Sequence, residues 1–131
     1  FGEWCYAVHS VRYTRLPDWF LAFDVYDRST GAFWSVDRRN ELAGTLGIVT
    51  VPELSRGRHS VESLPSLLGK SQFADGQAEG LYVRREASGL LSARAKLVRA
   101  EFAWAIEVHW SKRKLEENQL ARSQGSENAW R

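Results

Sequence analysis

Residues 79–99 read EGLYVRREASGLLSARAKLVR. Two strand-like runs, 81–85 and 90–99, flank the sequence Glu86-Ala87-Ser88-Gly89. Two such runs joined by a short loop that contains glycine predict a β-hairpin, because glycine adopts the backbone angles that tight turns require. The stretch therefore predicts two antiparallel strands that are neighbours in space.

Four other stretches predict shorter strands upstream of this hairpin. Residues 2–9 are rich in aromatic side chains and alternate loosely, and residues 20–27 (FLAFDVYD) form a nearly continuous apolar and aromatic run. A continuous run of this length predicts a strand buried on both faces. We expect residues 33–36 to return as its hairpin partner. Residues 47–51 are rich in β-branched side chains and are stopped by Pro52, which predicts another short strand.

Two helices are predicted between these strands and the hairpin. Asp37 is a favourable N-cap, and the helix that follows it should end near Gly44 or Gly47. A second, short helix is expected around residues 63–68, where Pro65 is tolerated within the first turn.

The remaining elements complete the predicted fold. Residues 101–110 place apolar side chains at the spacing of a helix with one buried face. Residues 121–131 are polar, and we expect a frayed tail there. The order of strands, hairpins and helices predicts an α+β fold with largely antiparallel sheets and packed helices. One domain should thus span residues 1–120.

Length and composition exclude several classes of protein. The chain has 131 residues, 44% hydrophobic and 26% charged, which suffices for one domain with a core. No apolar run approaches the ~20 residues of a membrane-spanning helix, so we expect no membrane partner. The lone Cys5 cannot form an internal disulfide, and this favours a reducing compartment, the cytoplasm. Because the chain begins with Phe1 and contains no Met, we expect a fragment whose upstream part is missing.

Basic residues are concentrated around the predicted hairpin, although the net charge is only +2. Residues 79–114 carry eight Lys or Arg and four Glu, and 14 of the 18 basic residues of the chain are Arg. A basic segment favours a phosphate-bearing partner, and the planar guanidinium suits phosphate recognition. A solvated basic face without a ligand explains the charge equally well.

Three charged residues of the hairpin are candidates for one site. Glu79 opens the first strand, and Arg94 and Lys96 lie two residues apart in the second, so they project from the same face. In a strand buried on both faces, two inward bases require an anion, because unpaired buried charge is costly. A carboxylate beside two bases suits a nucleotide phosphate with a divalent metal ion. The alternative is that the three side chains form salt bridges with one another.

Other chemistries find little support in the sequence. The three histidines are far apart and, with the single cysteine, lack the spacing of metal ligands. No nucleophile-elbow sequence supports a Ser/His/Asp triad. We expect the six tryptophans mostly in the core; the stacking of bases on Trp4 or Trp110 is a minor alternative.

Four sequence blocks occur in the order of known motifs. They are Gly2-Glu3-Trp4, Phe20-Leu21-Ala22-Phe23-Asp24-Val25, Glu79-Gly80-Leu81-Tyr82-Val83-Arg84 and Arg94-Ala95-Lys96-Leu97-Val98-Arg99. The blocks resemble motifs III, IIIa, IV and V of the covalent nucleotidyltransferase superfamily, and the likeness is closest to ATP-dependent RNA ligases of the RNA ligase 2-like family. It covers residues 2–120. The resemblance implies part of a nucleotidyltransferase domain, the ATP-grasp-like adenylation domain of ligases.

The resemblance implies nucleotide contacts for the first two blocks. Glu3 would lie near the ribose of the bound nucleotide. Phe23 would stack on the adenine, and Asp24 would support that wall of the pocket.

The last two blocks would supply the phosphate and metal contacts. Glu79 would bind the divalent metal ion, Mg²⁺ or Mn²⁺, and Arg94 and Lys96 would contact the phosphates and the adenylate as catalytic residues. In the commonest form of motif V both bases are lysine. Because arginine keeps its proton, any acid role falls to Lys96.

The nucleophile of the family is absent from this sequence. Members of the family use a lysine in a Lys-x-Asp-Gly motif, which attacks the α-phosphate of ATP and becomes lysyl-AMP. None of the four lysines is followed by x-Asp-Gly, and Asp75-Gly76 is preceded by Phe73 and Ala74. The family places this lysine upstream of the Gly-Glu-Trp block, so we expect it in the missing upstream part.

The sequence thus predicts the C-terminal part of an ATP-dependent RNA ligase adenylation domain. The intact enzyme would form lysyl-AMP, pass AMP to a 5′-phosphate end and join that end to a 3′-hydroxyl. Its partners would be ATP or AMP and RNA, as a nicked duplex or a hybrid. One alternative is a non-catalytic nucleic-acid-binding module that uses the basic hairpin. The other is a DNA ligase or capping-type nucleotidyltransferase, which shares the motifs.

Overall fold

The computed structural model describes residues 1–104 and 114–122. Within these residues the strands form three antiparallel pairs, β1–β2, β3–β4 and β5–β6. The elements in chain order are β1 (Gly2–Trp4), β2 (Phe20–Ala22), β3 (Tyr26–Asp27), β4 (Ala32–Phe33), α1 (Val36–Leu46), the 3₁₀-helix η1 (Val61–Leu67), β5 (Gly80–Ala87), β6 (Leu90–Val98) and α2 (Ala100–Trp104). The predicted α+β fold with antiparallel sheets is confirmed.

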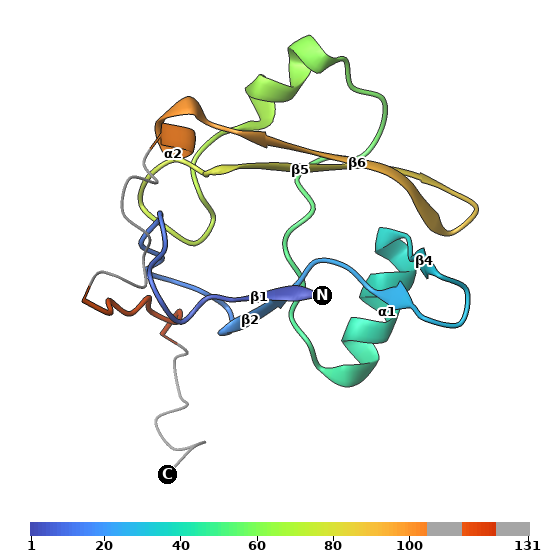
Figure 1. The fold of residues 1–131 in the computed structure, drawn as a ribbon. Coiled ribbons are helices and arrows are strands. Elements are labelled where there is room, and N and C mark those ends of the chain that lie inside the picture. The colour runs from blue at the N-terminus through green and yellow to red at the C-terminus, as the bar shows by residue number, and fades with distance from the viewer. Residues whose placement is uncertain (105–113, 123–131) are drawn as a thin grey trace.

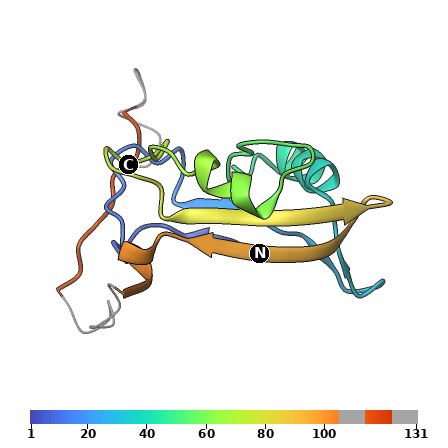
Figure 2. The same cartoon turned by 90° about the horizontal axis from the view of Figure 1, so that it is seen from above.

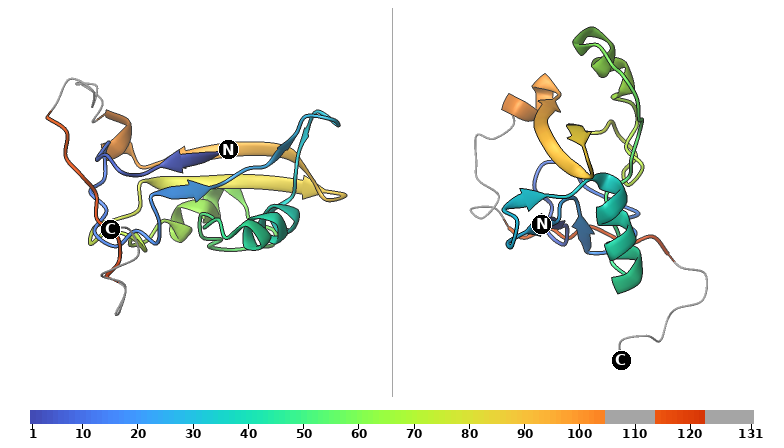
Figure 3. Two further views of the ribbon diagram at one scale, coloured as in Figure 1. Left: turned by 90° about the horizontal axis from the view of Figure 1, so that it is seen from below. Right: turned by 90° about the vertical axis from the view of Figure 1, so that its right-hand side faces the viewer.

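The β5–β6 hairpin and the β1–β2 pair form two layers that face each other (Figure 1). Seen from above, the hairpin overlies the β1–β2 pair, and η1 lies along β5 (Figure 2). η1 lies above the hairpin and α1 below it in Figure 1, and the view from below shows both helices beyond the β5 edge of the hairpin (Figure 3). The chain therefore brings its N-terminal strand and its late hairpin together, although about 80 residues separate them in sequence.

The predicted hairpin is confirmed, since β5 and β6 pair along their whole length with one irregularity after Arg85. At the turn, Ser88 (φ 54°) and Gly89 (φ 74°) adopt the left-handed backbone conformation. Glycine adopts this conformation without strain, so Gly89 in the sequence correctly predicted the position of the turn.

β6 is not buried on both faces, and this expectation was wrong. The side chains of Arg94 and Lys96 are exposed. β5 and β6 form a two-stranded sheet in the part of the chain that the structure describes, so β6 has one strand neighbour there. The argument that inward bases in a buried strand require an anion therefore does not apply. The register sets Tyr82 opposite Lys96 and Arg84 opposite Arg94, so these four side chains share one face.

The run 20–27 is divided into two short strands and is not one strand buried on both faces. Leu21 and Ala22 are buried, but Phe20 and Tyr26 keep 36% and 42% of their surface exposed. The chain leaves the β1–β2 pair after β2 and turns into β3, which pairs with β4. The hairpin partner predicted at residues 33–36 is therefore present as β4, which begins one residue earlier and ends at Phe33, while Val36 belongs to α1.

Residues 47–51 form a single parallel bridge with β2 in place of the predicted strand. Ala22 N–H donates to the carbonyl of Val49, and Val51 N–H donates to the carbonyl of Ala22. The predicted first residue of this strand, Gly47 (φ 67°), instead ends α1 as its C-cap.

The N-cap of α1 is Ser35 and not Asp37. The Ser35 hydroxyl accepts a hydrogen bond from the backbone N–H three residues on, at 3.4 Å. Asp37 lies in the first turn, where its charge complements the helix dipole. The carboxylate of Glu86, from β5, accepts the Val36 N–H at 3.0 Å. A contact from a distant strand thus helps to set where the helix begins.

The helix predicted at 63–68 is the 3₁₀-helix η1, and Pro65 lies inside it and not in its first turn. Ser60 is its N-cap, and Leu68 N–H donates to the Pro65 carbonyl at 3.1 Å where it ends. Proline removes one N–H from a helix interior, which is consistent with the short, tight form of this helix.

The helix predicted at 101–110 begins as α2. Residues 105–110 lie outside the described residues, and so do residues 123–131 of the predicted tail. Ala121, the first residue of that predicted tail, is held by the chain, because its N–H donates to the carbonyl of Leu16 at 2.8 Å.

A small apolar core packs around β1 and β2. Its buried members are Cys5, Leu16 and Leu21. Partly buried side chains surround them: Tyr13, Trp19, Val49, Val51 and Phe73. Because this core is small, buried polar contacts contribute much of the specificity of the fold.

Residues 114–122 run along the N-terminal part of the chain (Figure 1). Ala7 pairs with Glu117 in the antiparallel sense, and Leu16 pairs with Leu120 in the parallel sense. The sequence carries no periodicity that predicts this segment, because its contacts are single bridges.

Asn118 fixes this segment from the inside. It is 4% exposed, and its amide nitrogen donates to the carbonyls of Cys5 (2.8 Å) and Ala7 (3.1 Å). Its side-chain oxygen accepts the N–H of Tyr13 at 2.8 Å. One side chain therefore satisfies three backbone groups that would otherwise be buried without partners.

A buried ion pair connects the two layers. Asp24, which follows β2, is 1% exposed, and the guanidinium of Arg84 on β5 donates to its carboxylate. The Tyr82 hydroxyl donates to the other carboxylate oxygen at 2.9 Å. Burial acts to lower the pKa of Arg84, but its hydrogen bonds with Glu86 and Asp24 hold that pKa above its ordinary value. Arg84 therefore stays charged and Asp24 has a permanent partner.

We predict that Arg84→Ala lowers the free energy of unfolding by about 3–5 kcal/mol, because it leaves the buried Asp24 carboxylate without its main partner. The adjacent Arg85 is exposed, and Arg85→Ala should change stability by less than ~0.5 kcal/mol. Urea unfolding followed by circular dichroism measures both. Equal stabilities for the two variants would contradict a structural role for this ion pair.

Asn118→Ala should lower the free energy of unfolding by about 3 kcal/mol, because three buried backbone groups lose their partner. Gln119 has an exposed side chain, and Gln119→Ala is the control, with an expected change below ~0.5 kcal/mol. Thermal unfolding of both variants gives the comparison. A stability of Asn118→Ala equal to that of the control would show that the segment 114–122 does not contribute.

Candidate functional site

A polar cavity of about 130 Å³ lies between the two layers. Its walls come from β1 and the loop that follows it, from the residue before β5, from the C-terminal part of β6 and from the segment 114–122. The lining residues are Glu3, Cys5, Ala7, His9, Ser10, Val11, Tyr13, Glu79, Lys96 and Asn118. Three of the six residues that the sequence predicts for the site, Glu3, Glu79 and Lys96, thus line one cavity.

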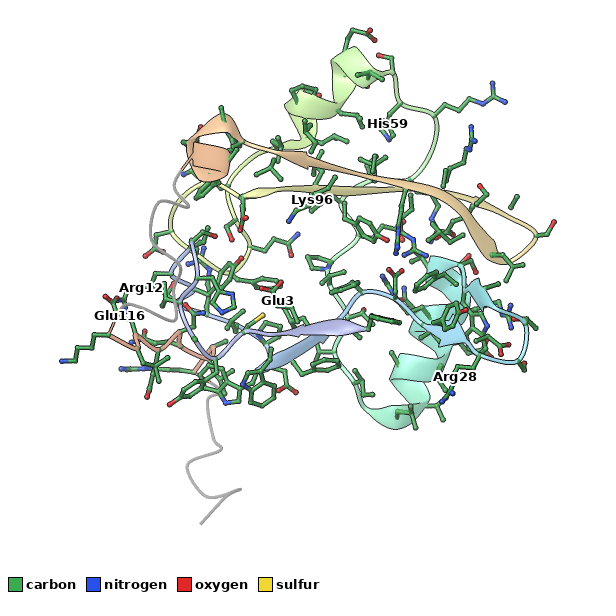
Figure 4. All side chains as sticks on the ribbon, in the orientation of Figure 1. Glu3, Arg12, Arg28, His59, Lys96 and Glu116 are labelled. Atoms are coloured by element: carbon green, nitrogen blue, oxygen red, sulfur yellow. The ribbon has the colours of Figure 1, made fainter. Side chains whose placement is uncertain are left out.

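Lys96 extends from β6 toward the layer that carries Glu3, as Figure 4 shows. The Glu79 carboxylate accepts a hydrogen bond from the Ser10 hydroxyl at 2.9 Å. On the other side, Nδ1 of His9 lies 3.8 Å from a carboxylate oxygen of Glu3. The cavity therefore combines two carboxylates, one ammonium group and two further polar side chains from the loop after β1.

A glycine stands next to each glutamate, and each glycine lets two paired strands of one layer approach closely. A Cβ at Gly80 would clash with the carbonyl oxygen of Leu97 on the paired strand. A Cβ at Gly2 would lie 2.6 Å from the carbonyl oxygen of Leu21. Only glycine fits at either position, because the backbone of the paired strand lies too close for a side chain. This explains the glycine beside each glutamate in the sequence.

The other three predicted site residues lie outside this cavity, in a neighbouring cluster. Asp24 is the buried partner of Arg84. A guanidinium nitrogen of Arg94 lies 3.6 Å from the Asp24 carboxylate, and this guanidinium stacks over the Phe33 ring at 4.8 Å from its centre. The alternative that Arg94 forms a salt bridge with Glu79 is therefore wrong, because the acidic partner of Arg94 is Asp24. Phe23 belongs to the same cluster.

Tyr82 connects the cavity with this cluster, and sequence reasoning assigned it no role. It stands opposite Lys96 in the hairpin, and its hydroxyl donates to Asp24. Its ring meets the Phe23 ring edge to face, with 6.2 Å between their centres. The signal for Tyr82 was its place in the third block, two residues from Arg84 on the same strand face. Arg94 and Lys96 therefore share the hairpin face of Tyr82, while Glu79 lies immediately before β5.

Cys5 and Tyr13 also line the cavity, and the sequence did not predict them as site residues. Burial, followed by the nearby charge of Glu3, raises the pKa of Cys5 to about 11. Burial, with the negative charges of Glu3 and Glu79, raises the pKa of Tyr13 to about 12. Both groups therefore stay protonated and neutral at physiological pH, so Cys5 is not a thiolate nucleophile.

The cavity suits one polar part of a ligand. Its volume is below the ~300 Å³ at which small-molecule sites begin, so a larger ligand would extend from it along the face that carries Tyr82 and Phe23. The carboxylate of Glu79 and the ammonium of Lys96 fit a divalent cation with a phosphate, because Mg²⁺ binds one or two carboxylates together with substrate phosphates. In residues 1–104 and 114–122 no three His, Cys, Asp or Glu side chains form a metal-binding group of their own.

Trp4 faces away from this cavity. It pairs with Phe20 in the β1–β2 ladder, and adjacent residues of a strand point to opposite faces, so Glu3 points inward and Trp4 outward. Trp4 is 62% exposed. The minor alternative that it stacks bases at the pocket rim is therefore wrong.

A model of the RNA ligase family matches residues 1–98, more than half of the 131 residues. The chain therefore belongs to the RNA ligase family. The match ends at the last residue of β6 and includes every predicted site residue. Searches of the curated proteins and of the solved structures found no match. Among the described residues, no helix has the length and apolarity needed to span a membrane.

We predict that alkylation of Cys5 by iodoacetamide in the folded chain reaches half its maximal rate near pH 11, against 9.0 in the unfolded chain. Because the folded state holds the thiol proton more tightly, the free energy of unfolding should fall as the pH rises from 9 to 11. Circular dichroism at each pH verifies that the chain is folded, and Cys5→Ala gives the background. A midpoint near 9 in the folded chain would contradict the buried, neutral thiol.

Proposed function

We propose that this chain supplies the adenylate and phosphate pocket of an ATP-dependent RNA ligase of the RNA ligase 2-like family, without the nucleophilic lysine. The supporting observation is that Glu3, Glu79 and Lys96 line one cavity within the part of the chain that matches the family. The charges of these three side chains complement a nucleotide with a bound divalent cation.

Glu3 is proposed to accept a hydrogen bond from the ribose, and Phe23 to stack on the adenine. The arrangement supports this division, because Tyr82 lies between Phe23 and Lys96 on the hairpin face. Asp24 is buried and paired with Arg84, so it would support the adenine wall through that ion pair and not by touching the nucleotide.

Lys96 is proposed to contact the phosphates and the adenylate directly, and Glu79 to hold a Mg²⁺ or Mn²⁺ ion. Such an ion would neutralise phosphate charge during transfer. Lys96 is exposed in β6 and extends into the cavity, so its ammonium group is free to meet an oxyanion there. Arg94 adds positive charge from the neighbouring cluster, and since arginine keeps its proton, proton donation falls to Lys96.

The reaction of the whole enzyme would run in three transfers. A lysine outside these 131 residues would attack the α-phosphate of ATP, forming lysyl-AMP with release of pyrophosphate. AMP would then pass to the 5′-phosphate of an RNA end. Attack of a 3′-hydroxyl on that end would form the phosphodiester bond and release AMP. The residues of this chain would hold the adenylate and offset phosphate charge in each transfer.

A second candidate function is a non-catalytic nucleic-acid-binding module. It is favoured by one observation: none of the four lysines stands in a Lys-x-Asp-Gly motif. The match to the RNA ligase family supports the ligase proposal over a DNA ligase or a capping-type nucleotidyltransferase.

We predict that the 131-residue chain acquires no covalent label from radioactive ATP with Mg²⁺, yet binds ATP. Glu79→Ala and Lys96→Ala should each weaken ATP binding about tenfold or more, because each removes a charged contact. Lys70 is exposed and lies outside the cavity, so Lys70→Ala should bind ATP as the wild type does. Equilibrium dialysis with labelled ATP measures the affinities.

Each contrary result of this experiment has a distinct meaning. Covalent labelling of the chain would show that it contains the nucleophile. ATP affinity unchanged in both cavity variants, together with weaker binding of RNA, would support the non-catalytic module in place of the ligase pocket.

A further inference from the structure

Two consecutive residues of the loop after β1 contact the two carboxylates of the cavity. His9 lies beside Glu3, with 3.8 Å between Nδ1 and the carboxylate oxygen. Ser10 donates its hydroxyl hydrogen to Glu79 at 2.9 Å. The two carboxylates come from opposite layers, β1 and the start of β5, so one loop reaches both sides of the site.

The backbone of this loop is fixed immediately before His9. Val8 N–H donates to the carbonyl of Glu116 at 2.8 Å, and the buried amide of Asn118 donates to the carbonyl of Ala7 at 3.1 Å. Arg12 forms an ion pair with Glu116 a few residues further along, and Figure 4 shows the two side by side. The N–H of Tyr13 donates to the side-chain oxygen of Asn118 at 2.8 Å, so the backbone is held on both sides of His9 and Ser10.

Both carboxylates need such support to act at a defined position. The Glu3 side chain is 59% exposed and projects from a strand of three residues. An exposed glutamate samples several rotamers, and selecting one of them costs conformational entropy when a ligand binds. A partner that already restricts the carboxylate removes part of this cost, which is the usual role of groups that orient catalytic and ligating side chains.

We propose that His9 and Ser10 are positioning residues, His9 for the contact of Glu3 with the ribose and Ser10 for the contact of Glu79 with the metal ion. This inference rests on the proposed function. It assigns to the loop the selection of ribonucleotides over deoxyribonucleotides and the coupling of nucleotide binding to Mg²⁺. Each role has its own measurable signature, because the sugar and the metal can be changed separately.

The first experiment compares the affinities of the 131-residue chain for ATP and 2′-deoxy-ATP by equilibrium dialysis. His9→Leu removes the nitrogen that faces Glu3 and should lower the ratio of the two affinities about fivefold. His9→Asn keeps an N–H donor near the position of Nδ1 and should retain more of the ratio than His9→Leu does.

The second experiment measures ATP affinity with and without Mg²⁺. Ser10→Ala should reduce the gain in affinity that Mg²⁺ gives about tenfold, as expected for the loss of a group that orients a metal ligand. Ser10→Thr keeps the hydroxyl and should retain most of that gain. Ser10→Ala should leave the ratio of ATP to 2′-deoxy-ATP unchanged.

The chain offers a matched control in a second serine–histidine contact. The Ser55 hydroxyl and Nε2 of His59 lie 3.0 Å apart in an exposed loop, and His59 lies on the far side of the hairpin from Glu3 (Figure 4). His59→Leu and Ser55→Ala should change neither the sugar ratio nor the Mg²⁺ dependence. Thermal unfolding of every variant shows that it is folded.

The outcomes separate the inference from the function on which it rests. Wild-type chain that binds neither nucleotide would overturn the proposed function and, with it, this inference. Wild-type binding of ATP with an unchanged sugar ratio in His9→Leu, or with equal losses for both nucleotides, would overturn the positioning role of His9 alone. An unchanged gain from Mg²⁺ in Ser10→Ala would overturn the role of Ser10.

Discussion

The buried carboxylate of Asp24 joins the two layers on which the rest of the structure depends. It follows β2 in one layer and receives hydrogen bonds from Arg84 and Tyr82 of the hairpin in the other. The apolar core is small, so correct placement of the hairpin over β1 and β2 relies on this polar contact. A buried charge of this kind tolerates few alternative arrangements, because every misplacement leaves it unpaired.

The hairpin face carries two parts of the site, a polar cavity and a packed cluster of side chains. Lys96 enters the polar cavity, where Glu3 and Glu79 have exposed surface and loop partners. Arg94, at the next position along the same face, turns toward Asp24 and the Phe33 ring. Lys96 and Arg94 carry the same charge on the same face of β6, yet one lines a polar cavity and the other packs against Asp24 and Phe33. The residues of the opposing layer cause this difference.

The sequence predicted the elements that depend on local pattern. The hairpin of residues 79–99, the end of α1 at Gly47 and the α+β class follow from turn residues and element order. Prediction failed where contacts between distant residues decide: Glu86 helps to set the start of α1, and the cavity wall formed by Asn118 has no periodic signal. The motif pattern selected the six site residues, but it could not assign three of them to the cavity and three to the adjoining cluster, since that depends on the register and on the opposing layer.

The amide of Asn118 bonds to the carbonyl of a residue 113 positions earlier in the chain. Contacts over such a separation form late in folding, because a long loop must close before they are gained. During synthesis from the N-terminus, the strands β1 and β2 and the complete hairpin leave the ribosome before the wall that Asn118 provides. The cavity is therefore finished by the last described segment to be translated, and a nascent chain that lacks it exposes the inner side of the loop after β1.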